Sequence, residues 1–283
     1  MYKILTKLKK LSNGFEYLEV KNSAATAKIA LSGAHIFQYK RDNEEDMLWL
    51  SDISAFEEGI AIRGGIPICW PSFGKNNPML PQHGFARTSL FSLLYSEEID
   101  EHTTEVLLRL TDSKESRKLW NYKFELNLKI IVSKTLKIEL QTINKDGQQF
   151  TLTQAFHSYF NISNIDDVSI SGLNKKPYLD ALDGKIKTQD GDIKFTSEYD
   201  AVYQKAGEEI VLKDKNRTVS IRTEGSDSAV VWNPWIKKCS QMSYMTKEAY
   251  KEFVCIESSN AFDDFITLKA SQSHTLKATF TPL

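Results

Sequence analysis

The residues best suited to chemistry fall in three short segments, and the first of these carries two arginines. Arg63 opens the run RGGIP, and Arg87 closes the run QHGFAR, which also contains His83. A guanidinium fork matches the oxygens of phosphate or carboxylate groups. Glycine and proline shape the backbone around both arginines. This pattern predicts an anion site, although two arginines that merely pair with acidic neighbours would look the same.

The other two segments each hold a residue that can move a proton. His157 lies in AFHSYFN at the end of a strand-like run, and an imidazole titrates near pH ~6.5. Glu257 ends the apolar run FVCIE, where desolvation would raise the carboxyl pKa and make a better base. Each has a structural alternative: a histidine satisfied in a polar corner of the core, and a carboxylate bonded to backbone amides or to an arginine. The tryptophans Trp70, Trp232 and Trp235 could stack on a sugar or simply fill the core.

Motifs that the sequence lacks exclude several other kinds of site. Neither G-x-G-x-x-G nor G-x-x-x-x-G-K-[ST] occurs, and the five histidines form no H-E-x-x-H or H-x-H. There is no G-x-S-x-G nucleophile elbow. The cysteines Cys69, Cys239 and Cys255 are odd in number and far apart, so we expect each to be a small buried residue in a reducing cytoplasm. Two alternatives therefore remain: a reaction without a metal or another cofactor, or no reaction at all.

The elements that must position these residues are strands. Apolar residues alternate with mostly polar ones over residues 122–132 and again over 136–141, and the intervening Ser-Lys-Thr suits a hairpin. Only residues 112–120 and 246–253 suggest short helices, the second capped by Thr246. Such a pattern predicts an all-β fold of antiparallel sheets packed as a sandwich. Further strands are expected at residues 27–31, 36–39, 105–110, 218–222, 229–233, 253–257 and 275–280.

Residues 59–84 differ from the rest of the chain. This stretch holds four of the seven prolines and five of the 13 glycines, which exclude a regular helix or a central strand. It also holds Ile66, Ile68 and Trp70, so it is too apolar for a solvated linker. We expect a long ordered loop pinned against the core, a kind of loop that often carries function.

Length and charge narrow the functional class. The chain has 283 residues, with 36 Lys and Arg against 37 Asp and Glu. A near-zero net charge argues against a nucleic-acid-binding protein. No apolar run approaches the roughly 20 residues that cross a bilayer, and Lys7, Lys9 and Lys10 interrupt any secretory leader. Without a linker or a repeat, residues 1–283 are expected to form a single domain.

Read together, the segments resemble the hexose-6-phosphate mutarotases, or glucose-6-phosphate 1-epimerases, of the galactose mutarotase-like superfamily. The resemblance covers nearly the whole chain and matches only loosely around residues 239–250, which receive no role. It implies a large β-supersandwich with His157 as catalytic acid and Glu257 as catalytic base. It also implies that Asp200 binds sugar hydroxyls, that Arg63, Gln82 and Arg87 bind substrate, and that His83 lines the site. The matching segments, in the family's order, are RGGIPICWPSFG, LPQHGFAR, FHSYFNIS, ISGLNKKPYLDAL, YDAVY, VVWNPW and FVCIESSNA.

The implied reaction interconverts the α and β anomers of a hexose 6-phosphate, with glucose 6-phosphate the expected substrate. One acid and one base on either side of the anomeric centre would open the ring, allow the C1–C2 bond to rotate, and reclose it. The expected partner is this small molecule alone, bound by a monomer. Three alternatives stay open: a non-catalytic carbohydrate-binding protein, an aldose 1-epimerase acting on unphosphorylated sugars, and a glycoside hydrolase, which would need two carboxylates.

Overall fold

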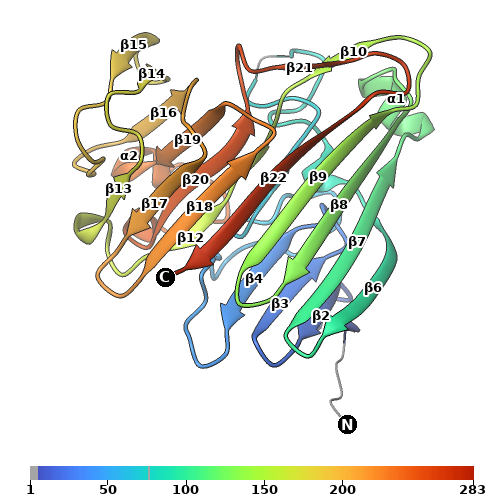
Figure 1. Cartoon of the computed structure of the whole chain (residues 1–283), viewed down its shortest axis with the longest axis horizontal. Coiled ribbons are helices and arrows are strands. Elements are labelled where there is room, and N and C mark those ends of the chain that lie inside the picture. The colour runs from blue at the N-terminus through green and yellow to red at the C-terminus, as the bar shows by residue number, and fades with distance from the viewer. Residues whose placement is uncertain (1–5, 76) are drawn as a thin grey trace.

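The computed structural model describes residues 6–75 and 77–283; residues 1–5, part of the run in which no leader is expected, lie outside it. As the alternation predicts, antiparallel strands dominate, and two eight-stranded sheets form most of the molecule (Figure 1). The first sheet has the order β13 (Ser169–Ser171), β17 (Glu209–Lys213), β18 (Thr218–Glu224), β22 (Ser273–Pro282), β9 (Leu136–Asn144), β8 (Phe124–Val132), β7 (Thr103–Thr111) and β6 (Ser92–Asp100).

The second large sheet contains the strand that carries Glu257 and the two strands that flank His157. Its order is β15 (Lys185–Thr188), β14 (Pro177–Asp180), β16 (Tyr199–Tyr203), β19 (Ser228–Asn233), β20 (Phe253–Asn260), β11 (Gln154–Phe156) and β5 (Ile68–Cys69), with β12 (Tyr159–Asn161) also pairing with β20. Two smaller sheets comprise β1 (Lys7–Lys10), β2 (Glu16–Lys21), β3 (Ala25–Ala30) and β4 (Ile36–Arg41), and the pair β10 (Phe150–Leu152) and β21 (Ile266–Leu268).

The period-two pattern explains the core between the sheets. Along β8, the residues Phe124, Leu126, Leu128 and Ile130 are buried, and β9 continues the same face after a hairpin at residues 133–135. One large hydrophobic cluster takes side chains from both eight-stranded sheets. The three cysteines are buried and free, as expected. Burial of apolar area on this scale is the main stabilising contribution to such a sandwich.

Helices are few, and one of the two predicted helices is wrong. Helix α1 (Lys114–Leu119) lies within the predicted residues 112–120, and the Ser113 side chain caps it. Residues 246–253 form no α-helix: they contain a single 3₁₀ turn, η3 (Ala249–Lys251), before β20 begins. Pairing of β20 with β12 extends the backbone from Phe253 onward, so tertiary pairing overrides the local helical preference. The remaining short helices are α2 (Trp235–Cys239), η1 (Ala86–Thr88) and η2 (Ile165–Asp167).

The described parts of the predicted loop, residues 59–75 and 77–84, pack against the core through several apolar side chains and contain one short strand, β5. Ile66, Ile68 and Trp70 are fully buried, and the Trp70 indole Nε1 donates to Thr142 Oγ1 at 2.9 Å. Trp70 therefore fills the core rather than meeting a ligand.

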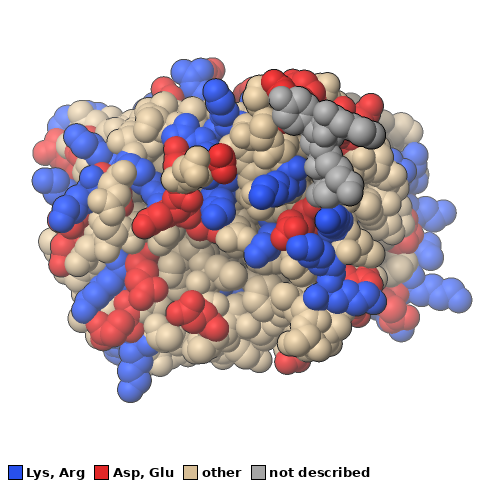
Figure 2. Space-filling model, turned by 90° about the horizontal axis from the view of Figure 1, so that it is seen from below, with Lys and Arg blue, Asp and Glu red and all other residues tan. Residues whose placement is uncertain are grey.

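Basic and acidic side chains are interspersed on the face drawn in Figure 2, so neither sign of charge dominates that face. This agrees with the near-zero net charge of the sequence. Among the described residues, no helix is long and apolar enough to cross a membrane.

Candidate active site

A single cavity of about 370 Å³ brings together all seven residues named from the sequence. Its volume falls within the range of small-molecule sites. The predicted residues that line it are Arg63, Gln82, His83, Arg87, His157, Asp200 and Glu257. Asp200 and Glu257 lie on strands β16 and β20, His157 lies in the connection between β11 and β12, and the other four lie in residues 63–87.

Strand pairing places His157 beside Glu257. Strand β20 pairs with β11 through residues 258–260 and with β12 through residues 253–255, so Glu257 lies opposite the two residues that separate β11 from β12. His157 is the first of those two. Its Nδ1 lies 3.4 Å from Glu257 Oε1. In the described structure neither His157 Nδ1 nor Glu257 Oε2 has a hydrogen-bond partner, although both atoms are buried. The geometry therefore matches neither structural alternative. Within the described residues, His157 is not a fully hydrogen-bonded core histidine, and Glu257 is not bonded to backbone amides or to an arginine.

Aromatic rings enclose the imidazole. The ring of Tyr159 stacks on His157 with centroids 4.9 Å apart and an interplanar angle of 8°. The rings of Trp232 and His83 meet it edge-on at 5.7 Å and 5.6 Å. These contacts fix the plane of the imidazole and exclude water from its sides.

Burial shifts the two proton-transfer groups in opposite directions. Desolvation, assisted by the nearby charge of Asp200, raises the pKa of the Glu257 carboxyl well above its usual value. Desolvation, followed by the influence of His83, Arg87 and Arg63, lowers the pKa of His157 well below its usual value. The buried pair therefore favours a neutral imidazole and a protonated carboxyl, because each charged form would be poorly solvated.

Neither arginine pairs with an acid among the described residues. The salt bridges in residues 6–75 and 77–283 include no contact of Arg63 or Arg87 with a carboxylate. Arg87 donates through one terminal nitrogen to the backbone oxygen of Gln82 at 2.7 Å, and Arg63 Nε is buried with no partner. The sequence alone allowed both arginines to form structural ion pairs with acidic neighbours. In the described structure their positive charge faces the cavity without such a partner. Such charge suits an anionic ligand.

Close backbone contacts hold the Arg63 segment, and they explain its glycines. Gly64 has φ +110°, and a Cβ there would lie 2.4 Å from the oxygen of Trp49. No other residue fits that space. The backbone oxygens of Gly65 and Pro67 accept hydrogen bonds from the amides of Tyr159 and His157 at 2.9 and 3.0 Å. The loop that carries Arg63 thus also fixes the backbone of the candidate acid.

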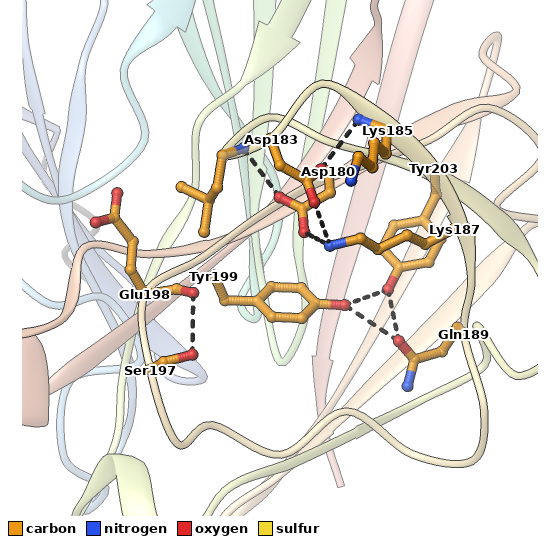
Figure 3. A network of polar contacts seen from close by, with 10 residues as sticks. Asp180, Asp183, Lys185, Lys187, Gln189, Ser197, Glu198, Tyr199 and Tyr203 are labelled. Atoms are coloured by element: carbon orange, nitrogen blue, oxygen red, sulfur yellow. Dashed lines mark hydrogen bonds and ion pairs between the residues drawn. The ribbon is translucent and has the colours of Figure 1, made fainter.

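Asp200 lines the cavity from β16. Lys238 Nζ lies 3.6 Å from Asp200 Oδ2 and 3.1 Å from Glu198 Oε1. Burial raises the pKa of Asp200, and the charge of Lys238 opposes that shift. The other face of β16 is anchored by a polar network, in which the hydroxyls of Tyr199 and Tyr203 lie 2.6 Å apart and each lies 3.1 Å from Gln189 Oε1 (Figure 3). This network braces the strand that presents Asp200.

The sequence model of the family described as Aldose 1-epimerase matches residues 16–281. The chain belongs to the aldose 1-epimerase family. It is 36% identical over 280 residues to a protein of Cenchrus ciliaris named "Putative glucose-6-phosphate 1-epimerase", covering 94% of this chain and 84% of that one. A protein of Escherichia coli strain K12 with the same name is 34% identical over 264 residues, covering 92% and 88%.

Solved structures agree with this assignment. The chain superposes on a Salmonella typhimurium protein described as a "putative mutarotase (YeaD)" with a TM-score of 0.91 and 32% identity, covering 99% of this chain and 96% of that one. The β-supersandwich expected from the sequence is confirmed. The chain is an isomerase of the epimerase and mutarotase type.

Several side chains of this epimerase that line the cavity carried no assigned role in the sequence. Tyr159 could have been found from period two, because it shares a face with His157 two residues away. Lys238 and Met242 come from α2 and the turns that follow it; Met242 lies in the segment to which no role was given. Nothing in the sequence marks them. The described residues contain no group of three or more His, Cys, Asp or Glu side chains suited to a metal ion.

Proposed function

We propose that this protein interconverts the α and β anomers of a hexose 6-phosphate, with glucose 6-phosphate as substrate. One observation carries the proposal. A buried histidine and glutamate with unpartnered polar atoms share a cavity with two arginines that no described carboxylate neutralises. The first pair suits proton transfer, and the second suits a phosphate dianion.

The reaction requires a proton at the ring oxygen and removal of the proton of the C1 hydroxyl. In the proposed mechanism His157 donates to the ring oxygen while Glu257 accepts from the hydroxyl, and the C1–O5 bond breaks to give the aldehyde. After rotation about C1–C2, the hydroxyl at C5 attacks the other face of the carbonyl and the two groups reverse roles. Both oxygens are bonded to C1 in the closed sugar. Two side chains separated by 3.4 Å can therefore serve neighbouring oxygens rather than spanning the ring.

The pair of His157 and Glu257 is active when it carries one transferable proton. A neutral imidazole with a protonated carboxyl carries the same number of protons as an imidazolium with a carboxylate, so the two forms interconvert by a transfer within the pair. Burial favours the neutral form. A phosphate dianion at Arg63 and Arg87 would offset the positive charge that disfavours the imidazolium, and would thereby favour His157 as the acid.

The remaining predicted residues would orient the sugar. Asp200 accepts hydrogen bonds from ring hydroxyls, and Gln82 and His83 complete the phosphate side of the cavity. Trp232, which also lines the cavity, offers an apolar ring to a sugar face. Fixing the anomeric carbon against the acid and base is the main gain from these contacts.

Anomer-resolved NMR tests the proposal. Purified protein is added to equilibrated glucose 6-phosphate, and exchange between the two anomeric C1 proton signals is measured by magnetisation transfer. Exchange well above the buffer rate supports the proposal. Binding without faster exchange would instead identify a carbohydrate-binding protein. Faster exchange on free glucose or galactose than on the phosphate ester would identify an aldose 1-epimerase of unphosphorylated sugars.

We also infer that residues 1–283 act as one domain and as a monomer in the cytoplasm. The single large hydrophobic cluster, which extends from Leu18 to Phe280, supports one domain. Free buried cysteines fit a reducing compartment. Light scattering coupled to size exclusion would test the oligomeric state.

A further inference from the structure

The turn between β3 and β4, residues 31–35, lies against the segment that carries Arg87. The amide of Gly33 donates to the oxygen of Ser89 at 2.7 Å, and the amide of Phe91 donates to the oxygen of Leu31 at 3.0 Å. Gly33 has φ +74°, and a Cβ there would lie 2.6 Å from the backbone oxygen of Arg87. The turn therefore packs directly on the backbone of one arginine.

The same turn contacts the segment that carries Arg63. His35 is fully buried, and its Nε2 lies 2.8 Å from the backbone oxygen of Gly64. Because a carbonyl only accepts, Nε2 carries the hydrogen and Nδ1 is the bare nitrogen. The fit is tight, since a Cβ at Gly65 would lie 2.6 Å from that Nε2. The next residue, Ile36, accepts a hydrogen bond from the amide of Ile66 at 2.9 Å.

We propose that the turn at residues 31–35 sets the position of Arg63 relative to Arg87, with His35 and Gly33 as positioning residues for the phosphate group. The inference rests on the proposed function. A dianion held by two guanidinium groups needs both at a fixed separation. The two arginines are 24 positions apart on irregular loops, and this turn touches the backbone beside each.

The chemistry of His35 suits a fixed donor. Burial, together with the charge of Arg87, lowers the pKa of His35 to about 3, while the hydrogen bond to Gly64 opposes the shift. The imidazole therefore remains neutral, and its donor unchanged, at every pH at which the reaction would be measured. Leucine would fill much of the volume but leave the Gly64 oxygen unpaired. Glutamine can place an amide N–H near the position of Nε2, whereas asparagine is too short.

The first experiment compares His35→Leu, His35→Asn and His35→Gln on glucose 6-phosphate and on free glucose. We expect His35→Leu and His35→Asn to raise KM for the phosphate ester about tenfold, with kcat and the free-glucose rate changed less than about twofold. His35→Gln should restore most of the affinity. Equal losses on both substrates in a folded variant, or no rescue by glutamine, would overturn the proposal. His274→Leu is the matched control, because this histidine bonds to Asn260 and does not line the cavity.

A double-mutant cycle tests the route of the effect. If His35 acts through Arg63, then His35→Leu should change KM less than about twofold in an Arg63→Ala background. Independent, additive losses would contradict it.

Glycine variants test the other contact. Gly33→Ala should also raise KM for the phosphate ester, because its methyl group meets the Arg87 backbone. Gly14→Ala is the control, since Gly14 has φ +87° with nothing within 4 Å of a Cβ. Both alanines carry the backbone strain of positive φ, but only one displaces an arginine. Similar KM values for the two variants would overturn this part of the inference.

Calorimetric titration with inorganic phosphate separates this inference from the proposed function. If wild-type protein binds phosphate and His35→Leu binds it about tenfold more weakly, the positioning role holds even where no anomer exchange is found. If exchange is found but phosphate affinity is equal in wild type and His35→Leu, the function stands and the positioning role fails. Absence of phosphate binding in wild type would overturn the positioning role, whereas the proposed function would still be decided by anomer exchange on glucose 6-phosphate.

Discussion

The acid/base pair and the arginine pair share one cavity but are held in different ways. His157 and Glu257 lie on or beside paired strands, where ladder register fixes which residue faces which. Arg63 and Arg87 lie on irregular segments, where glycine-permitted contacts between backbones replace a ladder. The regular sheet thus positions the groups that every aldose would need, and the loops position the groups that only an anionic sugar would use. Substitutions in the acid/base pair should therefore lower activity equally on phosphorylated and free sugars, whereas substitutions in the arginine pair should lower it mainly on phosphorylated sugars.

The largest effect is expected at the acid/base pair. Glu257→Gln and His157→Asn should each reduce anomer exchange by at least about 10²-fold, because each removes a positioned proton-transfer group. Since both groups act on the anomeric centre, the loss should be the same for phosphorylated and free sugars. Magnetisation-transfer NMR on both substrates gives the measurement, with circular dichroism as the check of folding. Near wild-type exchange in a folded variant would remove that residue from the mechanism.

A smaller and selective effect is expected at the arginines. Arg63→Ala or Arg87→Ala should lower kcat/KM for glucose 6-phosphate by roughly 10- to 100-fold, the value of one or two charge-assisted hydrogen bonds. Activity on free glucose, which has no phosphate, should hardly change. Steady-state kinetics on both sugars would check this. Equal losses on the two substrates would make the arginines structural.

The pH dependence should report the proton shared by His157 and Glu257. Below the lower apparent pKa of the pair both groups are protonated, and above the upper one neither is, so kcat/KM should follow a bell with tenfold loss per pH unit, about the limiting slope for one proton, on each side. In Arg63→Ala the upper limb should move to higher pH, because loss of a positive charge favours the protonated imidazole. Rate profiles from pH 5 to 9 would show it; a flat profile in the chemistry-limited range would exclude the pair.

The smallest effect concerns stability. The pKa of Glu257 is higher in the folded protein than in the unfolded chain. Between its unfolded value near ~4.3 and the folded value, the folded state binds more protons, so the unfolding free energy falls as pH rises. Glu257→Gln cannot lose a proton, and its unfolding free energy relative to wild type should therefore increase from pH 5 to pH 7, by up to about 1.4 kcal/mol per pH unit. Urea titrations at the two pH values provide the test; a parallel pH dependence in both proteins would mean that the carboxyl is not shifted.

The sequence was most informative where side chains follow a regular period. The alternation over residues 122–132 and 136–141 predicted β8, β9 and their hairpin, because burial on one face of a sheet forces period two. The same rule fails at residues 246–253, where local composition favours a helix but pairing with β12 begins at Phe253. Local preference cannot report a partner strand nearly a hundred residues away.

The site was predictable only in part, for a related reason. Arg63, Arg87, His157 and Glu257 stand in unusual local contexts, and the cavity does contain them. Their roles stay predictions until the variants are measured. That no described carboxylate pairs with either arginine could not be predicted from the sequence, because ion pairing depends on which distant segments meet. Lys238 and Met242 reach the cavity only because the turns after β19 fold back over it.

The hydrogen bonds from His157 and Tyr159 to the oxygens of Pro67 and Gly65 have a consequence for redesign of this scaffold. Transplanting a foreign loop in place of residues 63–67 would replace Arg63, the proposed phosphate anchor, but it would also remove the two carbonyls that hold the backbone of His157, the proposed acid, and of Tyr159. If these roles are correct, replacing the loop cannot change substrate preference without also affecting proton transfer. A library that varies only the side chain at position 63 could explore sugars that carry other anchoring groups. Insertions and deletions in the same stretch should instead lower anomer exchange itself.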